Sequence, residues 1–104
     1  MVDIVKNNLN KISQACNSMQ VKSLYLFGSA ARVTDYSENS DLDFLFEFIK
    51  ADNGLPVSEF DYFDLLWKLE EITGKKVDLV SNGRIRNKYF LRSILEDRIK
   101  LYEA

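Results

Sequence analysis

Hydrophobic residues recur with helical spacing near the start of the chain. The steps of four, three and four predict a helix over residues 3–17, with Asp3 as a possible N-cap and one face packed on the core. The residues at these steps are Val5, Leu9, Ile12 and Cys16.

Two more helices are expected in the second half of the chain. The first runs from Ser58 to Thr73, with Ser58 as its cap and Gly74 where a C-terminal cap belongs. Four of five spaced residues in it should face the core; the five are Phe60, Phe63, Leu66, Trp67 and Glu70. The second runs from Arg84 to Glu96. Its expected inward residues are Tyr89 or Phe90, Ile94 and Leu95.

Shorter apolar runs predict strands between these helices. They are residues 21–27, 42–49 and 76–80, and Arg98 to Glu103 reads as a last edge strand. In the second strand Phe44, Phe46 and Phe48 alternate onto one face, which should be buried. Strands alternating with helices indicate an α/β or α+β fold, with helices packed on a small sheet.

Composition narrows the class of protein. The 104 residues suit one domain, residues 1–104, and 46% hydrophobic with 29% charged residues is ordinary for a globular protein. No apolar run reaches the roughly 20 residues that cross a bilayer, and no signal peptide is visible, so we expect a cytoplasmic protein without membrane contact. Cys16 is the single cysteine and histidine is absent, which excludes an internal disulfide, Ser-His and Cys-His nucleophile pairs, and His-containing zinc sites.

Charge is distributed unevenly although the net charge is only -2. Residues 35–47 hold five acids and no base, whereas residues 75–100 hold eight bases and three acids. The basic segment is a weak indication of an anionic ligand, and solvated helix faces explain most such runs.

Three aspartates are the strongest candidates for chemistry. Asp41 and Asp43 are two residues apart at the start of a strand and therefore point to the same side. Asp78 lies between aliphatic residues of another strand, and if the two strands are neighbours three carboxylates converge. Such a group is unfavourable without a cation; Mg²⁺ suits it, and two ions would favour attack on a phosphorus. An Asp-x-Asp also occurs at plain strand ends, and Asp78 could simply lie on a wet face.

A glycine-serine pair supplies a candidate phosphate site. Gly28 and Ser29 follow a strand and open a possible short helix, whose free N–H groups suit phosphate. Arg32 could contact phosphate as well. A plain turn and a solvated arginine are the alternative interpretations.

Together these segments resemble the minimal nucleotidyltransferases of the DNA polymerase β-like superfamily. The resemblance runs from Val21 to Tyr102 and rests on three motifs: Gly28-Ser29-Ala30-Ala31-Arg32, Ser40-Asp41-Leu42-Asp43 and Val77-Asp78-Leu79-Val80. It implies the family's small mixed sheet with helices mainly on one face, and transfer of a nucleoside monophosphate from a triphosphate such as ATP. By the same resemblance Asp41, Asp43 and Asp78 would be catalytic and hold two Mg²⁺ ions. The nucleotide would contact Gly28, Ser29, Arg32 and Ser40.

The chain departs from the family pattern at two points. Val33 stands where the family usually has glycine, and eleven residues rather than ten separate Ser29 from Asp41. A surface loop tolerates an added residue at small entropic cost, so the metal site is expected to survive.

The resemblance also implies a partner. Members of this size resemble antitoxins paired with helical HEPN-type RNase toxins, and some transfer AMP to a tyrosine of the toxin. That is the leading hypothesis, and direct nucleic-acid binding is not expected. Two alternatives remain: a binding module that neutralises its partner by occlusion alone, and a nucleotidyltransferase acting on a small-molecule hydroxyl.

Overall fold

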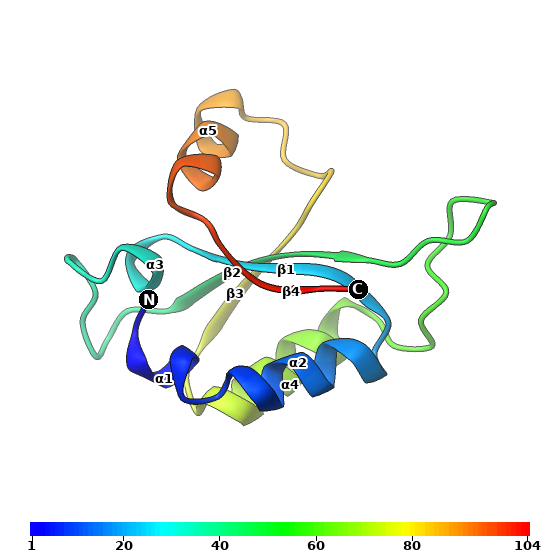
Figure 1. The fold of residues 1–104 in the computed structure, drawn as a ribbon. Coiled ribbons are helices and arrows are strands. Elements are labelled where there is room, and N and C mark those ends of the chain that lie inside the picture. Colours follow the sequence, from blue (N-terminus) through cyan, green and yellow to red (C-terminus); the bar gives the residue numbers. More distant parts are fainter.

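Four strands form one mixed sheet in the computed structural model, which describes residues 1–104 (Figure 1). Their order across the sheet is β3-β2-β1-β4. The pair β2 and β3 is parallel, and the other neighbours are antiparallel. The bounds are β1 Val21–Phe27, β2 Leu42–Phe48, β3 Val77–Ser81 and β4 Ile99–Glu103. All four predicted strands are confirmed, with β4 at an edge.

Five helices surround this sheet unequally. They are α1 Asp3–Lys6, α2 Leu9–Ser18, α3 Ser29–Arg32, α4 Tyr62–Thr73 and α5 Lys88–Asp97. In Figure 1, α1, α2 and α4 lie below the sheet and α5 lies above it. We call these sides the helix-covered face and the open face. The predicted small mixed sheet with helices mainly on one face is confirmed, and none of the helices has the length and apolar content needed to cross a membrane.

The main core fills the space between the helix-covered face and its helices. It is a cluster of 17 buried residues that includes Leu24, Phe44 and Leu69. Each large side chain buried in this way stabilises the fold by roughly 1.5–3 kcal/mol. The first predicted helix contributes to this core as expected, since Val5, Ile12 and Cys16 are buried and Leu9 packs against the cluster. It is not one continuous helix, however, but two, α1 and α2.

The break between α1 and α2 falls at two asparagines. Asn7 ends α1, and the Asn8 side chain donates a hydrogen bond to the carbonyl of Ile4 at 2.7 Å. Asparagine favours such local bonds over continued helix. The predicted cap at Asp3 is wrong: Val2 is the N-cap, and Asp3 lies in the first turn.

Helix α4 begins four residues later than predicted and is rotated relative to the prediction. The Asp61 side chain accepts from the backbone N–H of Asp64, and the Asp64 side chain accepts from the N–H of Asp61, forming a capping box. From this start the buried residues are Leu65, Leu69 and Thr73. The predicted inward residues Phe60, Phe63 and Trp67 are instead exposed. Gly74 caps the C-terminus in the left-handed conformation, as predicted.

Helix α5 rests on the open face through a second, smaller cluster. Ile94 is buried there with Phe27 and Leu45, so its predicted inward position is confirmed. Tyr89, Phe90 and Leu95 are exposed, which contradicts the prediction.

The start of α5 is also later than predicted. The Asn87 side chain accepts hydrogen bonds from the N–H groups of Tyr89 and Phe90, so the helix begins at Lys88 rather than Arg84.

Candidate active site

Parallel pairing of β2 and β3 brings two of the predicted carboxylates together. Asp43 and Asp78 are direct partners in the register, so their side chains leave the sheet on the same side, on strands about 4.8 Å apart. That side is the open face, since the neighbouring β2 residues Leu42 and Phe44 belong to the main core on the other side. Asp41 immediately precedes β2, two residues before Asp43. The predicted neighbourhood of the two strands is therefore confirmed.

Glycine at position 28 is required by the way β1 ends against Asp43. Phe27 pairs with Asp43, and the next residue, Gly28, has φ 72° and ψ -154°, a region that only glycine occupies readily. A Cβ at Gly28 would lie 2.4 Å from Oδ2 of Asp43. The carboxylate thus packs directly on the backbone of the turn, which joins the glycine-serine motif and the aspartates into one site.

The environment of Asp43 is unfavourable for its negative charge. Burial raises the pKa of this carboxyl group to about 6, and the charges of Asp78 and Asp41 act in the same direction. Arg32 opposes them by lowering the pKa. A cation beside Asp43 would remove this cost, because it would stabilise the ionised carboxylate.

The donor set fits Mg²⁺ in chemistry. Carboxylate oxygens are its usual protein ligands, and it commonly takes one or two of them and fills its other positions with water and substrate phosphate. Asp43 and Asp78 supply such a pair, with Asp41 as the next carboxylate. No group of three or more Cys, Asp or Glu side chains in residues 1–104 is already gathered as a metal site.

Helix α3 carries Ser29 at its first position, next to the aspartates. The side of α3 that faces the core is fixed, because Ala30 and Ala31 are buried and the N–H of Val2 donates to the carbonyl of Ala30 at 3.0 Å. The N–H groups of Ala31 and Arg32 both donate to the carbonyl of Gly28 at 3.1 Å, which leaves those of Ser29 and Ala30 at the start of α3 without a partner inside the helix.

Arg32 is held by two carboxylates from different parts of the chain. Its guanidinium donates to Asp35 at 2.8 Å and to Asp97, the last residue of α5, at 2.5 Å. Hydrogen bonds to Asp35 and then Asp97 raise the pKa of Arg32 above its usual range. A triphosphate would compete with both acids for this arginine. Sequence reasoning missed Asp97, because no local pattern marks a contact across 65 residues.

The loop between Arg32 and Asp41 is fixed at several points. Ser40 accepts a hydrogen bond from the N–H of Ser37 at 3.1 Å, closing a turn before Asp41. Lys75 donates to the carbonyl of Glu38 at 2.5 Å, and its ammonium group lies 5.4 Å from the ring centre of Tyr36. The added residue is thus accommodated in an anchored loop. Contact of Ser40 with a nucleotide stays a prediction.

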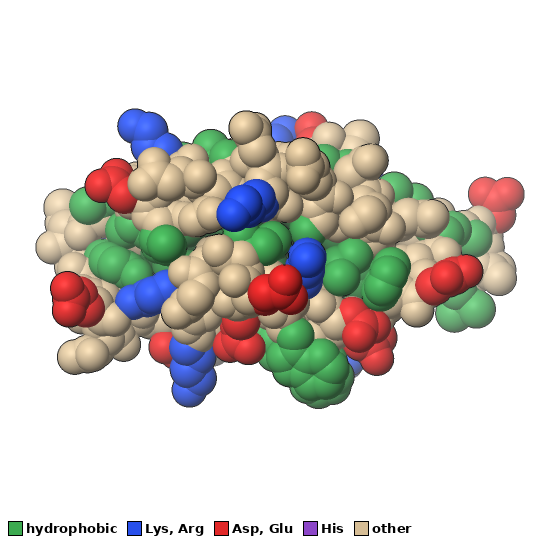
Figure 2. Space-filling model, turned by 90° about the horizontal axis from the view of Figure 1, so that it is seen from below, with side chains coloured by type: hydrophobic (Ala, Val, Ile, Leu, Met, Phe, Trp, Pro, Cys, Tyr) green, Lys and Arg blue, Asp and Glu red, His purple; other side chains and the backbone are tan.

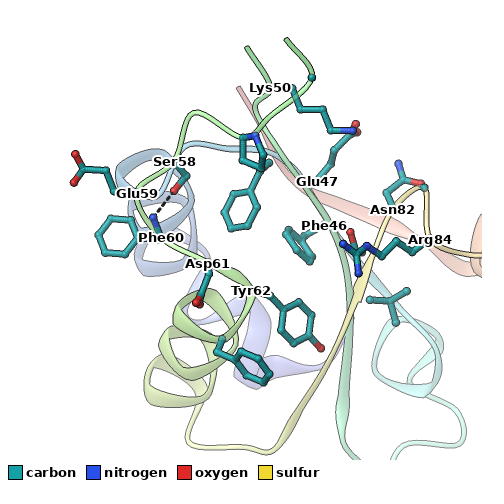
Figure 3. A pocket seen from close by; sticks show the side chains of 17 residues that line it. Phe46, Glu47, Lys50, Ser58, Glu59, Phe60, Asp61, Tyr62, Asn82 and Arg84 are labelled. Atoms are coloured by element: carbon teal, nitrogen blue, oxygen red, sulfur yellow. Dashed lines mark hydrogen bonds between the residues drawn. The ribbon is translucent and has the colours of Figure 1, made fainter. Parts of the chain in front are cut away.

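A large hollow of the molecule lies away from the carboxylates. It has a volume of about 1010 Å³ and lies beyond the far ends of β2 and β3, beside the start of α4 (Figure 3). Phe46, Tyr62 and Arg84 are among its lining residues, and the three aspartates are not. This hollow is therefore separate from the candidate active site and needs its own explanation.

The chain is similar to known proteins over most of its length. The sequence description of the nucleotidyltransferase domain matches residues 9–101. A protein of Methanocaldococcus jannaschii named "Putative protein adenylyltransferase MJ1379" is 45% identical over 80 residues, which cover 77% of this chain and 76% of that protein.

Solved structures share the fold. One described as a minimal nucleotidyltransferase is 26% identical, covers 94% of this chain and 95% of its own, and gives a TM-score of 0.71. A chain from the complex of the tri-AMPylated Shewanella oneidensis HEPN toxin with its MNT antitoxin is 19% identical, with a TM-score of 0.61 over 95% of this chain and 72% of that one. The latter likeness concerns the fold alone. With a match over most of its length and a relative of 45% identity, the chain belongs to the nucleotidyltransferase domain family.

Proposed function

We propose that this protein transfers AMP from ATP to a tyrosine hydroxyl of a HEPN-type toxin in a Mg²⁺-dependent reaction, and so acts as an antitoxin. The observation that carries the proposal is the pairing of Asp43 with Asp78 on the open face, directly against Gly28. This arrangement offers oxygen ligands beside a turn with free N–H groups. Both are needed for a magnesium-bound triphosphate.

Each residue has a defined task in the proposed reaction. Backbone N–H groups at Ser29 and the hydroxyl of that residue hold the triphosphate, and Gly28 leaves room for it. Asp41 and Asp43 provide metal ligands. Asp78 provides a third carboxylate and accepts the proton of the tyrosine hydroxyl. The tyrosine oxygen then bonds to the α-phosphorus, the bond from that phosphorus to the β-phosphate oxygen breaks, and pyrophosphate leaves.

Bound Mg²⁺ would supply positive charge against the phosphates and lower the pKa of the attacking hydroxyl. The chain's own contribution is to place carboxylates where burial and mutual repulsion make a cation favourable.

The identity of the donor and acceptor is supported by related proteins. The relative with 45% identity is named as a protein adenylyltransferase, which favours AMP as the group and a protein as the acceptor. A structural neighbour comes from a complex containing an AMPylated HEPN toxin. A helical toxin is therefore the first acceptor to test.

The test combines the purified chain with Mg²⁺, labelled ATP and a HEPN-type toxin protein. We expect label on the partner, removal of Mg²⁺ to abolish it, and Asp43→Asn or Asp78→Asn to reduce it at least about 100-fold, the usual effect of removing one transition-state stabilising group. Glu47→Gln, which changes an acid of the same strand outside the site, should leave labelling unchanged. No label with the wild-type chain, or equal label with Asp43→Asn, contradicts the proposal.

A second candidate function is neutralisation by occlusion without transfer. The observation that favours it is the engagement of Arg32 by Asp35 and Asp97, which leaves this arginine satisfied without a nucleotide. Under this alternative, a chain with Asp41→Asn and Asp43→Asn neutralises its partner at full strength. Lost neutralisation with the complex still intact would exclude it.

A further inference from the structure

A continuous row of aromatic rings leads from the interior to the surface of α4. Successive ring centres are separated by 5.0, 5.9, 5.2 and 5.8 Å. The rings belong, in order, to Phe48, Phe46, Tyr62, Phe63 and Trp67. Contacts at these distances fix each ring against its neighbour, so the outer rings are held in place although solvent reaches them.

The side chains at the outer end of this row are exposed to solvent and do not belong to the core. Phe60 is 44% exposed, Phe63 54% and Trp67 61%, while α4 buries Leu65 and Leu69 on its other side. We call Phe60, Phe63 and Trp67 the aromatic face. Single exposed hydrophobic residues are common, but adjacent rigid aromatics are typical of sites where another molecule binds.

The segment that carries the aromatic face is rich in acidic residues. Figure 2, which shows the molecule from the side of α2 and α4, has a protruding hydrophobic group with acidic side chains around it. From Ser58 to Glu71 the chain has five acids and one base, Lys68, which pairs with Glu71 at 3.6 Å. This charge repels nucleic acid and anionic lipid. It also opposes a symmetric pair of copies, which would place acids against acids, and it favours a partner with basic residues.

The neighbouring strand edge shows how such a partner can bind. Two outward backbone groups of β3 are already used: the Tyr62 hydroxyl donates to the carbonyl of Leu79, and Glu70 accepts from the N–H of Val77 at 3.1 Å. An added strand would find these groups occupied. Recognition therefore depends on side chains, as when an amphipathic helix lies on an apolar surface.

The hollow of Figure 3 adjoins this surface and gives it depth. Phe60 and Phe63 line it together with Phe46 and Tyr62, so its wall is continuous with the aromatic face. A large apolar side chain of a bound helix would fit there. The hollow thus receives an explanation independent of the nucleotide.

We propose that the aromatic face docks an amphipathic helix of the partner protein, whose apolar residues are flanked by Lys and Arg. The partner meant is the HEPN-type protein, so this inference rests on the proposed function. Docking occurs away from the open face and leaves Asp43 and Asp78 uncovered. It holds the partner while a separate segment carries the acceptor hydroxyl to the carboxylates.

The test measures binding of the HEPN-type protein by titration calorimetry, without nucleotide. Phe63→Ala with Trp67→Ala is expected to weaken binding at least 30-fold, as for interface residues worth about 2 kcal/mol. The matched control is Tyr89→Ala with Leu95→Ala, which removes exposed apolar side chains from α5 and should change binding less than threefold. Glu59→Lys should weaken binding and reduce its dependence on salt, because the partner's flanking residues are basic.

The outcomes separate this inference from the proposed function. Binding retained by Phe63→Ala with Trp67→Ala overturns the docking site, even if AMP transfer requires Asp43. Binding lost by that variant, with no transfer by the wild type, supports docking and contradicts the transferase proposal. If light scattering shows that the isolated chain self-associates and the α4 variant abolishes this, the face belongs to a second copy and the inference is wrong. A wild-type chain that does not bind the HEPN-type protein overturns it as well.

Discussion

The two faces of one sheet are built for different purposes. The helix-covered face contributes to a core of 17 buried residues, whereas the open face shares a cluster of only three with α5. Along β2 the alternation is direct: Phe44 is fully buried on one side, and Asp43 is partly exposed on the other. A strand can therefore provide stability with every second residue and, in the proposed function, chemistry with the residues between, so the two properties can be changed separately.

The largest expected difference between the two faces is in the free energy of unfolding. Truncating one buried residue on each face measures it. Phe44→Ala should lower the free energy of unfolding by about 3–5 kcal/mol, because a fully buried ring is lost from the main core. Ile94→Ala should cost about 2 kcal/mol, since its small cluster can close around the vacated space. Urea denaturation gives both values. Equal losses would show that the open face carries as much stability as the main core.

Gly28 is where the two properties meet, and its replacement should affect both. Gly28→Ala is expected to cost about 2–3 kcal/mol, from the strained backbone and from the Cβ lying 2.4 Å from Asp43. It should also displace the carboxylate and reduce Mg²⁺ binding. Gly54→Ala is the control, because Gly54 has φ +81° but nothing within 4 Å of an added Cβ. Thermal and chemical denaturation measure both variants. If Gly28→Ala and Gly54→Ala lower the free energy of unfolding equally, the contact with Asp43 costs nothing.

Sequence patterns identified the strands but not the rotation of α4. A short apolar run predicted β1, and alternation fixed β2 to within a residue, because a shift by one would expose an entire buried set. In α4 two stripes satisfy helical spacing, one with Leu65 and Leu69 and one with Phe63 and Trp67. Local hydrophobicity does not rank them, since aromatic residues are as apolar as leucine. The capping box and the packing of α4 against the sheet decide which stripe is buried.

The candidate site, like the fold, was predictable from the sequence only in part. Asp43 and Asp78 follow from the motifs once β2 and β3 are neighbours, and the register places them opposite each other. The contact of Arg32 with Asp97 was not predictable, because it depends on where α5 ends above the sheet. Val33 was noted as a departure from glycine, but its backbone conformation is visible only in the structure.

That conformation leads to a prediction of increased stability on the open face. Val33 follows α3 with φ 74°, where a β-branched residue is strained. Val33→Gly should raise the free energy of unfolding by about 1 kcal/mol, the relief of strain exceeding the entropy that glycine adds to the unfolded chain. Chemical denaturation measures it, with Val57→Gly as the exposed valine control that should not gain. A loss at position 33 would show that the loop supports the valine side chain.

The smallest expected change in stability comes from replacing Asp43. This substitution tests most directly whether a charge that the proposed reaction needs makes the fold less stable. Asp43→Asn keeps the shape of the side chain but removes a charge that burial, Asp78 and Asp41 all disfavour. In buffer with EDTA near neutral pH, the variant should melt at a slightly higher temperature than the wild type. The gain in the free energy of unfolding should be less than about 1 kcal/mol, because the Asp43 side chain is partly exposed. Asp35→Asn is the opposite control: Arg32 lowers the pKa of Asp35, so that substitution should not stabilise the chain.

Added Mg²⁺ should reverse the order of the two melting temperatures, since only the wild-type carboxylate gains from a bound cation. A variant that melts lower than the wild type already in EDTA would mean that Asp43 contributes to the fold, and that the open face is not reserved for chemistry.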